Sequence, residues 1–71
     1  MKNPTLADAK RLLKKNNPDL QALIVSWIKK PRRITNDRGY SWVTAKVKVS
    51  AEGYADKVMT ISRDHDSLMI R

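Results

Sequence analysis

Residues 40–50 read YSWVTAKVKVS, and this stretch decides the fold because its side chains alternate in kind with a period of two. The small or branched apolar set is Val43, Ala45, Val47 and Val49. The set between them is Tyr40, Trp42, Thr44, Lys46 and Lys48. Successive side chains of a strand point to opposite faces of a sheet. The pattern therefore predicts a strand with one face on a core and the other face toward solvent.

Shorter strand signals lie on both sides of this stretch. Residues 33–35 could form a short strand, which the turn-forming sequence Asn36-Asp37-Arg38-Gly39 would connect to residues 40–50. A turn at 51–53 leads to a second alternating stretch, 54–62, with Ala55, Met59 and Ile61 on one side. A polar turn at 63–66 precedes a short terminal strand at 67–70. Together these signals predict a three- or four-stranded antiparallel meander.

Residues 5–15 predict a helix. Thr5 is a suitable N-cap, and Asp8 follows three residues later, as in a capping box. Apolar residues recur at helical spacing, and Asn16-Asn17 ends the pattern. The apolar positions are Leu6, Ala9, Leu12 and Leu13.

A second helix is predicted between Asn17 and Pro31. Asn17 can cap it, Pro18 suits the first helical position, and Pro31 stops it. The apolar residues fall at i, i+3, i+4, i+7 and i+8. They are Leu20, Leu23, Ile24, Trp27 and Ile28. The expected fold class is α+β, with two N-terminal helices followed by a three- or four-stranded antiparallel β-meander in one domain, residues 1–71.

Composition narrows the classes of protein to consider. A chain of 71 residues has room for one core, and without cysteine it has no disulfide or thiolate metal site to support that core. The longest apolar run, Ala22–Val25, is far shorter than the ~20 residues that span a bilayer. No secretory signal is visible, so we expect a cytoplasmic protein.

Positive charge is the most unusual property of the chain. Fifteen Lys and Arg residues against seven Asp and Glu residues give a net charge of +8. Residues 1–48 hold twelve of the basic and three of the acidic residues, so the whole excess lies in the first two thirds. Self-repulsion of this size weakens a small fold. A polyanionic partner would balance it, and nucleic acid is the expected one.

The first candidate site is the basic segment Lys29-Lys30-Pro31-Arg32-Arg33, continued by Arg38. Its cations are close enough in sequence to reach neighbouring phosphates, and arginine adds bidentate geometry. Neutralising phosphates yields affinity through counterion release, whatever the base sequence. The alternative is a solvated charge run that aids solubility or acts as a localisation tag.

The second candidate is the polar face of the strand at 40–50. Aromatic rings that stack on bases, beside lysines that contact phosphates, are typical of sheets that hold single-stranded nucleic acid. The residues are Tyr40, Trp42, Thr44, Lys46 and Lys48. The alternative places Trp42 in the core, where most tryptophan side chains are largely buried.

The third candidate is the basic side of the first helix, which with Lys2 could lie along a nucleic-acid backbone. Its residues are Lys10, Arg11, Lys14 and Lys15. The alternative is that these cations only compensate the negative end of the helix dipole.

The sequence gives little indication of an active site. Asp64-His65-Asp66 could bind a divalent cation or act as acid and base, but a polar turn explains it more simply. There is no cysteine and only one histidine. We expect no catalytic residues, no metal and no cofactor.

The sequence therefore predicts a small DNA- or RNA-binding protein, a regulator or accessory factor of the kind that phages and plasmids encode. The alternative is a protein-interaction module or inhibitor that docks on an acidic surface of a host protein, with Tyr40, Trp42 and Tyr54 as its aromatic contacts. Membrane attachment is not expected, because the cations lie beside no broad apolar helix face. The oligomeric state is left open.

Overall fold

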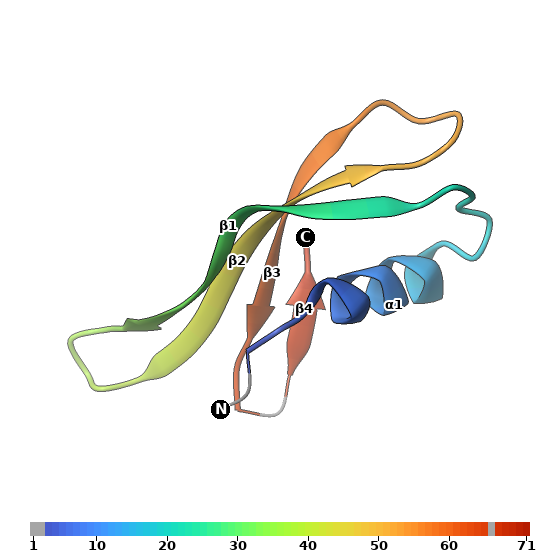
Figure 1. Cartoon of the computed structure of the whole chain (residues 1–71). Coiled ribbons are helices and arrows are strands. Elements are labelled where there is room, and N and C mark those ends of the chain that lie inside the picture. The colour runs from blue at the N-terminus through green and yellow to red at the C-terminus, as the bar shows by residue number, and fades with distance from the viewer. Residues whose placement is uncertain (1–2, 66) are drawn as a thin grey trace.

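The structure, a computed structural model, describes residues 3–65 and 67–71. Its elements run in the order α1 (Leu6–Asn16), β1 (Ile24–Thr35), β2 (Ser41–Ser50), β3 (Lys57–Arg63) and β4 (Leu68–Ile70) (Figure 1). The strands form one antiparallel sheet in the order β1-β2-β3-β4. The predicted α+β class and the meander are confirmed, with four strands. The prediction of two N-terminal helices is wrong, because the described chain contains only α1.

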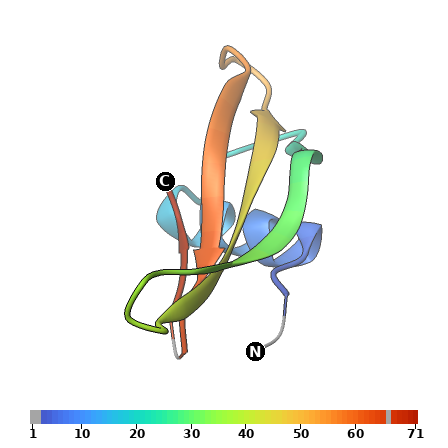
Figure 2. The same cartoon turned by 90° about the vertical axis from the view of Figure 1, so that its left-hand side faces the viewer.

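One face of the sheet is covered and the other is open. Ala9 and Leu13 of α1 are buried against Val47 of β2 and Ile61 of β3, both of which are completely buried. Figure 2 shows α1 behind the sheet, and no other helix or strand of the described chain lies in front of it. We call the face under α1 the inner face and the opposite face the outer face.

The start of α1 confirms the predicted capping box. The Asp8 backbone N–H donates to the Thr5 hydroxyl (3.1 Å), and the Thr5 backbone N–H donates to the Asp8 carboxylate (2.9 Å). The hydrogen bond from the Thr5 backbone is the main reason why the pKa of Asp8 lies below its usual value. Arg11 adds an ion pair to the same carboxylate at 2.8 Å. These contacts fix the point at which the chain enters the helix.

The segment predicted as the second helix is a loop followed by half of a strand. Ala22 has a φ of 53°, a left-handed conformation that interrupts any helix, and β1 begins at Ile24. A helix would have buried Ile24 and Ile28 together, but these are 63% and 48% exposed while Val25 is 6% exposed. Ile, Val and Trp favour strands as well. Pairing with the open edge of β2 therefore outweighs the helical spacing.

The strand that decides the fold is confirmed as β2, and the turn before it is confirmed too. The Asn36 backbone N–H donates to the Tyr40 carbonyl at 2.9 Å, and Gly39 adopts a φ of 79° that favours glycine. The Asn36 side chain accepts from the backbone N–H groups of Arg38 and Tyr40. In the described part of the chain, no helix has the length and apolar character needed to cross a membrane.

Candidate nucleic-acid interface

The outer face is built around alternate residues of β2. Antiparallel partners lie directly opposite each other and share a face. The outer-face residues of β2 are Trp42, Thr44, Lys46 and Lys48; their partners in β1 are Ile34, Arg32, Lys29 and Ser26, and three of them have partners in β3, namely Ser62, Thr60 and Val58. The outer face thus carries cations, hydroxyl groups and an aromatic ring.

Irregular pairing in β1 brings two of its cations to this face. Lys29 and Arg32 are three residues apart, so a regular strand would point them to opposite faces. Register shifts occur on both sides of Lys29, so Lys29 lies opposite Lys46 and Arg32 lies opposite Thr44. Such bulges re-aim side chains in many binding sites. Both cations therefore share the outer face with Lys46.

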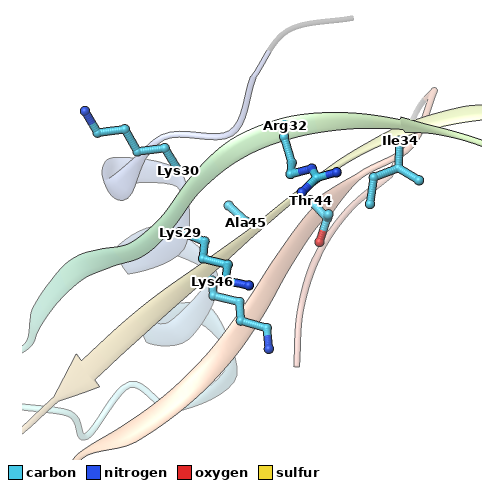
Figure 3. Close-up of a pocket in the computed structure, with 7 residues that line it drawn as sticks. All are labelled: Lys29, Lys30, Arg32, Ile34, Thr44, Ala45 and Lys46. Carbon is cyan, nitrogen blue, oxygen red and sulfur yellow. The ribbon is translucent and has the colours of Figure 1, made fainter.

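These cations surround a shallow hollow of about 250 Å³. Figure 3 shows the side chains of Lys29 and Lys46 extending in the same direction, with Arg32 next to Thr44. Lys30 contributes to the wall of the hollow, but its side chain extends away from the other lysines (Figure 3). The hollow therefore has cations on two adjacent strands and a hydroxyl group between them.

The charges around the hollow are not neutralised within the described chain. No carboxylate of residues 3–65 or 67–71 lies within 4.0 Å of Lys29, Arg32 or Lys46. Lys48 differs, because its ammonium group lies 3.3 Å from the Asp56 carboxylate. The pKa of Asp56 is lowered by a hydrogen bond from Ser50 and by Lys48. An anion on the outer face would therefore meet uncompensated charge at the hollow first.

Trp42 lies on the outer face and not in the core. Its ring is half-buried and packs against Tyr40, with ring centroids 5.9 Å apart and a tilt of 35°. Tyr40 is 40% exposed and also meets the His65 ring edge-on at 5.7 Å. The core aromatic is Trp27, which packs against the buried cluster from the inner face. Trp42 is thus available as an aromatic surface beside the cations.

The other predicted cations lie elsewhere. The exposed side of α1 carries Lys10, Arg11, Lys14 and Lys15, on the far side of the sheet from the hollow. Arg33 pairs with Val43 and so belongs to the inner face, and Arg38 lies in the β1–β2 turn. Lys2 lies outside the described residues. The structure therefore separates the basic residues that sequence reasoning had grouped together.

The predicted polar turn joins β3 to β4. The Asp64 carboxylate accepts a hydrogen bond of 2.6 Å from the His65 backbone N–H and also interacts with the Tyr40 hydroxyl group. The interaction between Tyr40 and Asp64 is the main cause of the lowered pKa of Asp64 and the raised pKa of Tyr40. Asp66, the third residue of the predicted cluster, lies outside the described residues.

Sequence reasoning missed several residues that complete the outer face. Ser62 and Met69 pair with each other across β3 and β4, and Ser62 also pairs with Thr44. They line a second hollow together with Trp42 and Asn36. Alternation within residues 54–62 places Ser62 on the outer side, but only the register of the β3–β4 hairpin adds Met69.

Comparison with protein-family models, with curated proteins and with solved structures found no match to this chain. Its function must therefore be inferred from its own residues and geometry.

Proposed function

We propose that this protein binds nucleic acid through the outer face and has no catalytic role. The observation that carries the proposal is the cluster of Lys29, Arg32 and Lys46 around one hollow, on a sheet face that α1 leaves open. Phosphate groups are the natural ligands of such a cluster, because each contact releases counterions from the nucleic acid. The Tyr40–Trp42 pair beside the cluster adds a surface for bases.

The cations of α1 provide a matched control. Sequence alone gives Lys10, Lys14 and Lys15 the same claim to phosphate binding, but they lie on the opposite side of the molecule. The triple variant Lys29→Ala/Arg32→Ala/Lys46→Ala and the triple variant Lys10→Ala/Lys14→Ala/Lys15→Ala remove the same charge. Any difference in binding between them therefore reports position and not net charge.

The test is fluorescence anisotropy with a labelled random-sequence oligonucleotide over a series of salt concentrations. For each phosphate that a variant no longer neutralises, the slope of log K against log salt should fall by about 0.7 for a single strand or about 0.9 for a duplex. The outer-face variant should neutralise about three phosphates fewer than the wild type, and the α1 variant should stay close to the wild type. Loss of binding in the α1 variant alone, or no binding by the wild type at low salt, would overturn the proposal.

A second candidate partner is an acidic protein. Ile24 and Val58 are 63% and 57% exposed on the outer face, near the Lys48 end, and they would suit an apolar contact beside the cations. Apolar anchors surrounded by charge are common in protein interfaces. Ile24→Ser would weaken a protein complex but would leave the salt slope of nucleic-acid binding unchanged, so the two candidates are separable.

A further inference from the structure

A second hollow lies on the outer face beside the cationic one. It has a volume of about 380 Å³, within the range of small-molecule sites, which begins at roughly 300 Å³. It lies where the β1–β2 turn approaches β3 and β4. Its walls include Asn36, Tyr40, Trp42, Ser62, Asp64 and Met69. Aromatic, thioether and hydrogen-bonding groups therefore converge on one space.

The two hollows are adjacent along the sheet. Ile34 of the first hollow is the direct partner of Trp42 in the second, and Thr44 of the first is the partner of Ser62 in the second. Directly opposite residues are about 5 Å apart. A polyanion whose phosphates contact Lys29, Arg32 and Lys46 would therefore extend its next unit over Trp42.

Charge distinguishes the second hollow from the first. The Asp64 carboxylate lies on its wall, and the described residues place no lysine there. Arg63 does line this hollow, but it pairs with Val43 on the inner face, where its guanidinium lies 4.0 Å from Asp8. A phosphate would be repelled by Asp64, whereas the amino or imino group of a base could donate to it. The wall chemistry therefore suits a base and not a second phosphate.

The aromatic wall is held in place before any ligand arrives. The Tyr40 ring is in contact with both Trp42 and His65, and the interaction of its hydroxyl group with Asp64 raises the pKa of Tyr40. A side chain restrained from three sides loses little conformational freedom when a ligand stacks on it. Met69, 43% exposed, forms the opposite wall and can adjust to bases of different size.

We propose that the hollow between Trp42 and Met69 holds an unpaired base, so that the ligand of the outer face is single-stranded nucleic acid. The inference rests on the proposed function and deepens it. A base can stack on an aromatic side chain only after leaving its helical stack, and bases of a regular duplex are already stacked on both sides. The cationic hollow provides affinity for any nucleic acid, and the second hollow selects the single strand.

The test compares a labelled oligothymidine, the single-stranded RNA oligouridine and a duplex of the same length at one salt concentration. Wild-type protein should bind either single strand more tightly than the duplex. Trp42→Leu keeps an apolar group but removes the π-face, so it should weaken single-strand binding about 5- to 100-fold. Trp42→Phe should recover most of the loss, and Tyr54→Leu, which removes an exposed aromatic side chain from the β2–β3 turn, should bind as the wild type does.

NMR distinguishes a local role of Trp42 from a structural one. In the wild type the indole N–H signal of Trp42 should shift on addition of oligothymidine, while that of Trp27, on the inner face, should not. Two outcomes would refute the base site and leave the proposed function intact. One is equal affinity for duplex and single strand. The other is unchanged binding by Trp42→Leu while Lys29→Ala/Arg32→Ala/Lys46→Ala fails to bind. Absence of all binding by the wild type would refute both.

Discussion

Exchanging one lysine on the outer face should stabilise the fold while weakening its binding. Lys29 and Lys46 are direct cross-strand partners, and within the described chain neither has a carboxylate within 4.0 Å. Like charges directly opposite each other destabilise a sheet, by roughly 0.2–1 kcal/mol, and opposite charges stabilise it by a similar amount. Lys46→Glu removes the repulsion from Lys29 and replaces it with an attraction, so both contributions stabilise the variant relative to the wild type.

The expected size of the effect follows from these two contributions. Their sum is about 0.4–2 kcal/mol, and we take about 1 kcal/mol because both side chains are exposed. For a domain of this length, this raises the melting temperature by about 4–8 °C at low ionic strength. In about 1 M salt the Debye length is about 3 Å, so most of the gain should disappear.

The assay is thermal unfolding followed by circular dichroism at low and at high salt. Lys30→Glu is the matched control, since it makes the same charge change in the neighbouring strand β1, but the Lys30 side chain extends away from Lys46 (Figure 3). Lys29→Glu/Lys46→Glu restores a like-charge pair and should lose the gain. Equal stabilisation by Lys46→Glu and Lys30→Glu, or a double variant as stable as Lys46→Glu, would refute the reasoning. If Lys46→Glu is more stable than the wild type and binds the oligonucleotide more weakly, unfolding cannot explain the loss of binding.

Two further predictions concern the fold. Val25→Thr puts a hydroxyl group into a site that is 6% exposed and should lower the free energy of unfolding in urea by about 1–3 kcal/mol. Ile24 is 63% exposed, so Ile24→Thr should change the free energy of unfolding by no more than about 0.5 kcal/mol. The reverse order of the two effects would instead support the helix predicted for this segment. Asp8→Asn should lower the stability of the fold at about pH 6. Folding lowers the pKa of Asp8, so the charged carboxylate stabilises the fold above its unfolded pKa of about 3.9. This stabilisation is lost as the pH falls through the pKa of Asp8 in the folded protein. The difference from the wild type in unfolding free energy should therefore close below about pH 4, and a constant difference would mean that the charge of Asp8 contributes nothing.

The parts of the fold that sequence predicted are those that local chemistry determines. The Thr5–Asp8 capping box needs only four residues, and the turn at Gly39 needs only a residue that tolerates a positive φ. The alternation in β2 specifies a strand by itself. Residues 24–28 fit both the spacing of a helix and the alternation of a strand. Pairing with the edge of β2, which lies about twenty positions further along the chain, decides in favour of the strand. No local pattern contains that information.

The candidate site was predicted in composition but not in arrangement, and β1 shows why. Alternation would have placed Lys29 and Arg32 on opposite faces, and only the two register shifts bring them together. Pro31 lies within this irregular stretch, where a residue without an N–H is tolerated because β1 is an edge strand. The same irregularity and its lysines make β1 a poor template for pairing with another chain. One local distortion therefore assembles the cationic hollow and protects the edge beside it, so a variant that made β1 regular would lose Lys29 or Arg32 from the outer face and would expose a regular strand edge.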